Sequence, residues 1–174
     1  MTELYYAYVE KEKSHEMLFH ILARYRNISA KEDDLVFNKN GKPSLGVDKP
    51  HFSISHTKGI VMIAVSDFPV GIDVEPTGRR LNDYRKLTKR FYAEEEFPKI
   101  KSTFDFLAVW TKKESAVKYF GGNITENLSR IVFERDTPSG RPELAGATTL
   151  TFALGDYVYS VTAREKPSSP LLLL

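Results

Sequence analysis

The chain has 174 residues, of which 41% are hydrophobic, 12% aromatic and 28% charged. This composition excludes an intrinsically disordered chain, and the length fits a single domain. The net charge of +2 is too balanced for a protein that holds nucleic acid through its phosphates, so no nucleic-acid partner is expected. The absence of cysteine excludes disulfides, thiolate metal sites and cysteine nucleophiles.

The positive charge is concentrated in one stretch. Residues 79–118 contain eleven Lys and Arg against six Asp and Glu, which predicts an anionic partner for this part of the chain. No apolar run is long enough to span a bilayer, and the N-terminus lacks the basic and then apolar pattern of a secretion signal. We therefore expect a cytoplasmic protein with no membrane partner.

The first half of the chain predicts a helix and several short strands. Residues 4–9 favour a strand, and Ser14 is a candidate N-cap for a helix with Leu18, Ile21 and Leu22 on one face. Residues 38–43 form a turn or loop. Three further strands, 52–55, 60–66 and 70–75, are expected to form an antiparallel meander.

The second half repeats this order of elements. A polar helix is predicted over 81–92, an acidic segment over 93–97 and a longer helix over 103–120, ended by Gly121 and Gly122. Strands are expected at 131–134, 149–153 and 157–163. The repeated order predicts one pseudo-duplicated α+β domain over 1–174. Its two lobes, about 1–76 and 77–166, would each have helix and a three-stranded, mainly antiparallel sheet, with a flexible tail at 167–174.

Two acidic residues on the strand 70–75 are the sharpest local feature. Asp73 and Glu75 are two residues apart, so both side chains point away from the face that carries Ile72 and Val74. Two carboxylates this close repel unless a cation lies between them, and oxygen ligands of this kind suit Mg²⁺. The alternative is an ordinary solvated face of an amphipathic strand.

A second pair lies on the helix 103–120. Glu114 and Lys118 are four residues apart and share one face of the helix. They are either a surface ion pair or a third carboxylate for a metal with an ammonium beside it that binds phosphate.

A third feature is His56, at the end of the strand that begins near His51. A histidine here can donate a hydrogen bond to a phosphate, and Lys42 in the preceding turn can do the same, although a loop histidine is more often bonded to backbone. His15 and His20 are five residues apart, which does not match a zinc-binding helix.

Five motifs together resemble one family. In chain order they are Gly41-Lys-Pro43, Phe52-Ser-Ile-Ser-His56, Gly71-Ile-Asp-Val-Glu75, Arg90-Phe-Tyr92 with Glu96, and Trp110-Thr-Lys-Lys-Glu-Ser115 with Lys118. This order and spacing is similar to that of the 4'-phosphopantetheinyl transferases, in particular the type that activates nonribosomal peptide synthetases such as surfactin synthetase. The resemblance runs from about Ser14 to the last predicted strand.

The resemblance implies a specific reaction. Members of this family transfer the phosphopantetheine arm of coenzyme A to a serine of an apo acyl or peptidyl carrier protein and release adenosine 3',5'-bisphosphate. These carriers serve fatty-acid, polyketide or nonribosomal peptide biosynthesis. The implied cofactor is Mg²⁺, which Mn²⁺ can replace, and coenzyme A is the co-substrate.

Residue roles follow from the same resemblance. The implied metal ligands are Asp73, Glu75 and Glu114, with Glu114 also helping to deprotonate the carrier serine. Lys118 and His56 would stabilise charge on the pyrophosphate. The implied contacts to coenzyme A come from Lys42, Pro43, Ser55, His56 and Lys118. Because the site is completed within one chain, we expect a monomer.

This chain departs from the larger members near its N-terminus. The stretch between the first strand and the first helix is short, and Glu16 stands where those relatives tend to carry an arginine. Lys11 and Lys13 are candidates to replace the lysines that bind the 3'-phosphate of coenzyme A. Two rival functions are a catalytically silent module that binds coenzyme A or carrier protein, and a metal-dependent phosphodiesterase that uses the same carboxylates.

Overall fold

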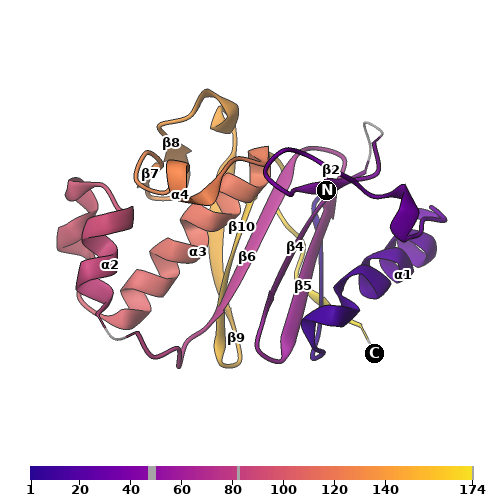
Figure 1. The fold of residues 1–174 in the computed structure, drawn as a ribbon, viewed down its shortest axis with the longest axis horizontal. Helices are drawn as coiled ribbons and strands as arrows, with labels where there is room; N and C mark the ends of the chain where they lie inside the picture. Colours follow the sequence, from indigo (N-terminus) through magenta and orange to yellow (C-terminus); the bar gives the residue numbers. More distant parts are fainter. Residues whose placement is uncertain (47–49, 82, 174) are drawn as a thin grey trace.

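Two small β-sheets, each covered on one face by a helix, form the frame of the molecule (Figure 1). The structure is a computed structural model and describes residues 1–46, 50–81 and 83–173. The first sheet has the strand order β11-β1-β5-β4 and the second has the order β6-β10-β9. The mixed α+β class predicted from the sequence is confirmed.

The first unit follows the order strand, helix, strand, strand. Its elements are β1 (Glu3–Ala7), α1 (Ser14–Arg26), β4 (His51–Thr57) and β5 (Ile60–Ser66). β5 lies antiparallel between β1 and β4. Helix α1 buries Leu18, Ile21 and Leu22 against Val61 and Ile63 of β5, as its apolar spacing predicts.

The expected N-cap of α1 is wrong by one residue. Lys13 holds the cap position and makes no side-chain cap hydrogen bond. Ser14 is the first helical residue, and its hydroxyl donates to the carbonyl of Lys11 at 2.5 Å. The short 3-10 turn η1 (Lys11–Lys13) runs directly into the helix. The helix therefore begins without the side-chain cap that a serine often provides.

The second unit has the same order. Its elements are β6 (Val70–Pro76), α3 (Thr103–Phe120), β9 (Thr148–Leu154) and β10 (Tyr157–Ala163). β10 lies antiparallel between β6 and β9, so the central strand is again the last in sequence. Helix α3 has the predicted bounds and ends at Gly121, whose φ of 69° is in the left-handed region.

The predicted three-stranded meander is therefore wrong in its last strand. β6 pairs with β10 over its whole length and belongs to the second sheet, although the predicted first half, about 1–76, includes it. Hydrophobic alternation indicates which face of a strand is buried and carries no information about which strand lies beside it. The repeated topology supports a pseudo-duplication whose second unit begins at β6.

The remaining elements decorate the second unit and the connections. Helix α2 corresponds to the predicted helix 81–92, of which Asn82 lies outside the described residues. The predicted strand 131–134 is found as β7, but it pairs with β8 in a separate ribbon and does not join the second sheet. The full set of these remaining elements is η2 (Glu32–Asp34), β2 (Val36–Phe37), β3 (Pro43–Ser44), α2 (Tyr84–Phe91), η3 (Glu94–Lys99), α4 (Ile124–Asn127), β7 (Val132–Glu134), β8 (Thr137–Ser139) and η4 (Pro142–Leu144).

The segment after residue 166 is not a free tail. Residues Leu171–Leu172 form β11, which pairs in parallel with β1. The N–H of Leu173 donates to the carbonyl of Tyr6 at 2.8 Å, while Leu174 lies outside the described residues. Composition alone predicts a flexible tail here, because it does not show the edge of β1 with which these residues pair.

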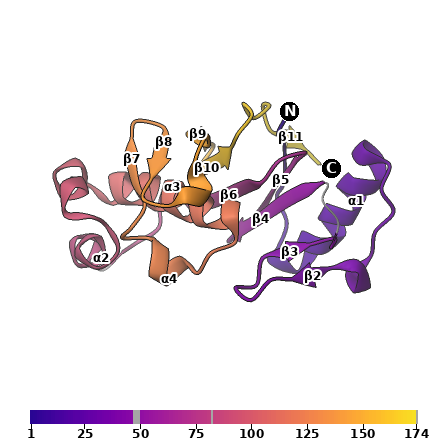
Figure 2. The same cartoon turned by 90° about the horizontal axis from the view of Figure 1, so that it is seen from above.

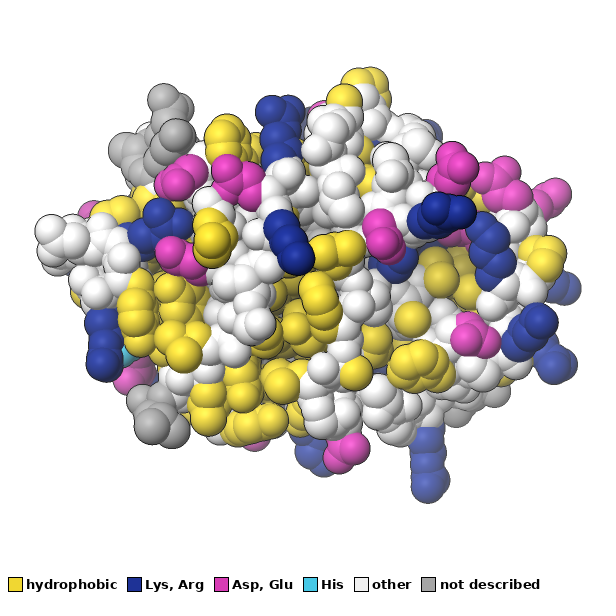
Figure 3. Space-filling model, turned by 180° about the vertical axis from the view of Figure 1, so that it is seen from behind, with side chains coloured by type: hydrophobic (Ala, Val, Ile, Leu, Met, Phe, Trp, Pro, Cys, Tyr) yellow, Lys and Arg dark blue, Asp and Glu magenta, His cyan; other side chains and the backbone are white. Residues whose placement is uncertain are grey.

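The two sheets share an apolar core. Ile72 and Val74 of β6 pack with Met62 of β5 and with Tyr159 and Val161 of β10. Seen from above, α1 and α2 lie at opposite ends and the sheets lie between them (Figure 2). On the back of the molecule, apolar side chains gather over the part formed by β9, β10 and β11 (Figure 3). Among the described helices, none combines the length and apolar character needed to cross a membrane.

Candidate functional site

A cavity of about 580 Å³ opens between the edge of the first sheet, β6 and α3. Most of the residues that the sequence marked as candidates line it, although they come from three separate parts of the chain. They are Ser55 and His56 from β4, Asp73 and Glu75 from β6, and Glu114 and Lys118 from α3. Lys42 and Pro43 line a neighbouring cavity.

The two acidic residues of β6 lie on the face that α3 covers. Their neighbours Ile72 and Val74 point into the core between the sheets, as the alternation predicts. Asp73 is only 4% exposed, and the side chain of Glu75 is 12% exposed. A solvated strand face is thereby excluded as the explanation of this pair.

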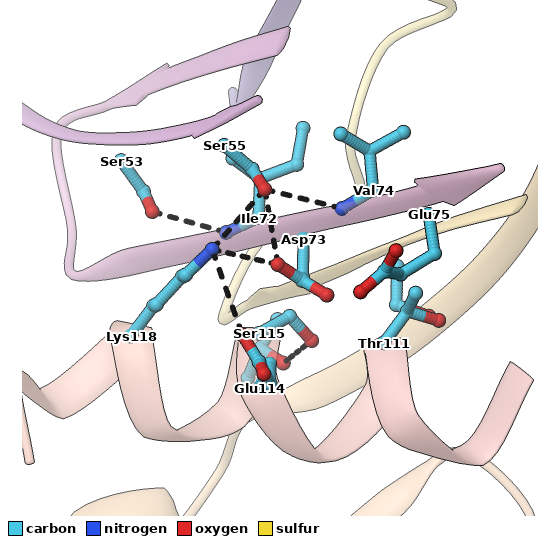
Figure 4. A network of polar contacts seen from close by, with 12 residues as sticks. Ser53, Ser55, Ile72, Asp73, Val74, Glu75, Thr111, Glu114, Ser115 and Lys118 are labelled. Carbon is cyan, nitrogen blue, oxygen red and sulfur yellow. Dashed lines mark hydrogen bonds and ion pairs between the residues drawn. The ribbon is translucent and has the colours of Figure 1, made fainter. Parts of the chain in front are cut away.

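Helix α3 approaches β6 closely because of Gly71. A Cβ at this position would lie 1.9 Å from the carbonyl oxygen of Ser115, so no other residue fits without displacing the helix. On the neighbouring strand β10, the helix is held by hydroxyl contacts. Thr111 bonds Ser160 at 2.8 Å, and Ser115 bonds Thr162 at 2.9 Å. This short spacing brings Glu114 and Lys118 over Asp73 (Figure 4).

Lys118 is the cation of the cluster. Its ammonium donates to Asp73 Oδ1 at 2.6 Å and lies 4.0 Å from Glu114 Oε2. Burial lowers its pKa, but the charges of Asp73 and Glu114 outweigh this effect and the pKa is raised overall. Lys118 therefore stays charged at neutral pH, and its pairing with Glu114 is part of a partly enclosed network.

The surroundings of Glu114 favour its protonated form. Burial, followed by the negative charge of Asp73, raises the pKa of Glu114 to about 8. A carboxyl group with a pKa near the working pH can both take up and release a proton in a reaction.

Arg79 is a site residue that sequence reasoning missed. Its guanidinium pairs with Glu75 and it lines the same cavity. The pKa of Glu75 is nevertheless raised, because burial outweighs the lowering effect of Arg79. The sequence does place Arg79 four residues after Glu75, at the start of the basic stretch. Outside a regular helix, however, this spacing does not predict that two side chains touch.

Lys113 holds α3 from its opposite side and was also missed. Its side chain is fully buried, and the ammonium pairs with Glu96 at 2.6 Å and donates to the carbonyls of Leu128, at 2.8 Å, and Ile131. Removing one partner of a buried pair like this leaves an uncompensated charge, which costs about 3–5 kcal/mol. The pair joins the turn of α3 that carries Glu114 to η3.

The donor set of the cavity fits a hard divalent cation. Carboxylates are oxygen ligands of the kind that Mg²⁺ binds, and Asp73 Oδ2 is buried without a hydrogen-bond partner among the described residues. Within the described ranges, no group of three or more His, Cys, Asp or Glu is already arranged to hold a metal ion. Lys118 and Arg79 neutralise Asp73 and Glu75 in this arrangement.

Lys42 lies where it supports α3. Its ammonium donates to the carbonyls of Lys118 at 2.5 Å, Tyr119 at 2.8 Å and Val70 at 3.1 Å. Burial lowers the pKa of Lys42 to about 8, while the three carbonyls favour the ammonium that they accept from. Lys42 thus joins the C-terminal end of α3 to the start of β6.

A further cavity of about 410 Å³ continues from the site toward α1. His56 is exposed and lines both this cavity and the first one, and Pro43 lines its wall. Lys11 also lines it. Lys13 does not line it and pairs instead with Glu16 at 2.6 Å.

Comparison with known proteins shows the same family throughout. The model of the family described as the 4'-phosphopantetheinyl transferase superfamily matches residues 69–162. The chain is 36% identical over 98 residues to the 4'-phosphopantetheinyl transferase gsp of Aneurinibacillus migulanus, which covers 51% of this chain and 39% of that protein.

Two further relatives come from Bacillus. The 4'-phosphopantetheinyl transferase psf-1 of Bacillus pumilus is 33% identical over 97 residues, or 52% of this chain and 40% of that protein. The 4'-phosphopantetheinyl transferase Sfp of Bacillus subtilis is 29% identical over 131 residues, or 68% of this chain and 57% of that protein. The matched part is about half the length of these relatives. Since the family model covers more than half of the chain, the protein belongs to the 4'-phosphopantetheinyl transferase superfamily.

Proposed function

We propose that the protein transfers the 4'-phosphopantetheine arm of coenzyme A to a serine of an apo acyl or peptidyl carrier protein, with Mg²⁺, and releases adenosine 3',5'-bisphosphate. The observation that carries this proposal is the convergence of Asp73, Glu75, Glu114 and Lys118 on one cavity in a member of this superfamily. The curated relatives bear the same activity in their names.

In this reaction the serine oxygen bonds to the phosphorus next to the pantetheine. The bond from that phosphorus to the bridging oxygen breaks, and the bridging oxygen leaves with adenosine 3',5'-bisphosphate. Asp73, Glu75 and Glu114 would hold the metal, which when bound supplies charge neutralisation on the pyrophosphate. Glu114 would take up the serine proton, directly or through water.

Cations of the site would bind the anionic part of coenzyme A. Lys118 from α3 and His56 from β4, which both line the cavity, would stabilise charge on the pyrophosphate. The nucleotide end would extend past His56 and Pro43 into the cavity near α1, where Lys11 is in place for a phosphate. Lys42 would act mainly by holding the end of α3, since its ammonium is directed at main-chain carbonyls.

Two groups of cations in the basic stretch have different uses. Arg79 and Lys118 line the cavity. The four cations of α2 are all exposed and do not line it. They are Arg85, Lys86, Lys89 and Arg90. We assign them to the approach of an acidic carrier protein, for which complementary charge speeds association.

The test is a mass measurement. Purified protein, coenzyme A, Mg²⁺ and an apo carrier protein are mixed, and the intact mass of the carrier is recorded with and without EDTA. A metal-dependent gain of one phosphopantetheine is expected, and a carrier whose acceptor serine is replaced by alanine should gain nothing.

Other outcomes point to the rival functions. Cleavage of coenzyme A without any gain of carrier mass would replace the transferase with a metal-dependent phosphodiesterase. Binding of coenzyme A with neither cleavage nor transfer, across several apo carriers, would replace it with a silent binding module. Light scattering of the purified protein tests the expected monomer.

A further inference from the structure

The two sheets meet edge to edge without a backbone ladder between them. β4 is the last strand of the first sheet and β6 the first strand of the second. Two serine hydroxyls of β4 take the place of backbone carbonyls here. Ser53 accepts the N–H of Ile72 at 3.1 Å, and Ser55 accepts the N–H of Val74 at 3.2 Å (Figure 4).

The two serines differ in what else they touch. Ser55 also donates its hydroxyl hydrogen to Asp73 Oδ1 at 3.0 Å and accepts from the Lys118 ammonium at 3.1 Å. A hydroxyl has one hydrogen to donate and two lone pairs to accept with, so these contacts use its full capacity. Ser55 is 4% exposed. Its hydroxyl has nothing left with which to bind a substrate.

The consequence for Asp73 is an asymmetric carboxylate. Ser55 and Lys118 both donate to Oδ1, while Oδ2 is buried and has no partner among the described residues. The carboxylate is therefore held by one oxygen, and the other oxygen is free to act as a ligand. Groups that orient a metal ligand in this way commonly change metal affinity or activity by about 10- to 100-fold when removed.

We propose that Ser55 is a positioning residue of the site. It locks Oδ1 of Asp73 and the ammonium of Lys118 in place, which leaves Oδ2 available to a metal ion, and its side chain would make no contact with coenzyme A. This inference rests on the proposed metal-dependent transfer. It replaces the direct coenzyme A contact that family resemblance implies for this side chain.

Ser53→Ala is the matched control for Ser55→Ala. Both hydroxyls are buried on the same strand, and each accepts one N–H of β6 at nearly the same distance. Both variants should therefore lower Tm by a similar amount. Only Ser55→Ala should also disturb Asp73, so the difference between the two variants isolates positioning from the joining of the sheets.

The measurements are the Mn²⁺ dissociation constant, read by electron paramagnetic resonance, and kcat and KM for carrier modification. In Ser55→Ala we expect Mn²⁺ binding weakened about tenfold or more and kcat reduced about 10- to 100-fold. KM for coenzyme A should change less than twofold. Ser55→Thr, which keeps the hydroxyl, should recover most of the metal affinity, and Ser53→Ala should resemble the wild type in all three values.

Two results would overturn the inference. Equal Mn²⁺ affinity and kcat in the two alanine variants would show that Ser55 only joins the sheets. A raised KM for coenzyme A with kcat and Mn²⁺ affinity unchanged would make Ser55 a substrate contact. If the wild type modifies no carrier, the proposed function fails, and the Mn²⁺ measurement still decides the role of Ser55 independently.

Discussion

The two units share one topology, yet their helices pack on their sheets through opposite chemistry. Helix α1 meets its sheet with aliphatic side chains such as Leu18, Ile21 and Leu22. Helix α3 meets β6 and β10 with hydroxyls, carboxylates and an ammonium, among them Thr111, Ser115 and Lys118. Buried polar groups of this kind stabilise little unless each has a partner.

This difference shows how one repeated unit can serve two purposes. The first unit supplies stability and an edge strand, β4, that faces the site. The second unit keeps apolar contacts between the start of α3 and Val158 of β10, and beside them it has a polar interface in which charged groups are held apart from bulk water. The residues between helix and sheet thus distinguish the unit that mainly stabilises the fold from the unit that carries most of the site.

The largest expected effect is on turnover and comes from the polar interface. Glu114→Gln should keep the fold and reduce kcat about 10²- to 10³-fold, because a ligand and proton acceptor is lost. The measurement is the rate of carrier modification by mass spectrometry, with Glu126→Gln on α4 as a control. Turnover near the wild-type rate would remove Glu114 from the mechanism.

A substitution in the apolar interface between α1 and its sheet should lower stability and leave turnover unchanged. Leu22→Ala on α1 is expected to lower the free energy of unfolding by about 2–5 kcal/mol, since Leu22 is fully buried. The kcat of the folded fraction should stay unchanged. Urea denaturation measures the loss of stability, and single-turnover rates measure kcat. A lowered kcat would mean that the packing of α1 also shapes the site.

A smaller stability effect is expected beneath α3. Thr162 bonds both Ser115 and Thr149, at 2.9 and 2.8 Å. Thr162→Val keeps the shape and removes this hydroxyl, which should cost about 1–3 kcal/mol through its unsatisfied partners. Denaturation curves measure the cost. A neutral or stabilising effect would show that the hydroxyls are not needed to seat the helix.

The pH dependence of stability provides a further test of the polar interface. The folded pKa of Glu114, about 8, exceeds its ordinary value of 4.5, so the folded state binds more protons between these values. The metal-free protein should therefore lose stability as pH rises from about 4.5 to about 8, by several degrees in Tm. Thermal melts in EDTA should show a flatter profile for Glu114→Gln, and identical slopes would contradict this account.

The smallest expected effect concerns the edge of the first unit. Lys11 lines the cavity next to His56, whereas Lys13 pairs with Glu16. Lys11→Ala should raise KM for coenzyme A up to about fivefold, as one exposed ion pair contributes about 0.2–1 kcal/mol. Lys13→Ala should leave KM unchanged. An equal KM for coenzyme A in the two variants would show that Lys11 does not contribute to coenzyme A binding.

Local patterns in the sequence were enough for the helices and for the face of β6. The bounds of α3 and the shared direction of Asp73 and Glu75 follow from periodicity and from the glycines after Phe120. These local patterns do not predict which residues pair when they are far apart in the sequence. The pairing of β6 with β10, of β11 with β1 and of Arg79 with Glu75 all depend on tertiary packing.

The same limit applies to the roles of single side chains. A motif marked Lys42 and Ser55 as residues of interest, but only three-dimensional contacts show that both are directed into the protein. Hydrogen-bond capacity, counted atom by atom, separates a group that supports the site from one that is free to touch a ligand.

The connection between β5 and β6 has a practical consequence. Residues 67–69 connect β5 of the first sheet to β6 of the second. β1, β4 and β5 precede this loop, whereas all three strands of the second sheet, and also β11, follow it. The surfaces that hold the units together are the shared apolar core, the serines of β4 and the pairing of β11 with β1. We therefore expect that a cut at this loop yields two pieces that reassemble through these surfaces and restore the cavity, and carrier modification would measure the reassembly.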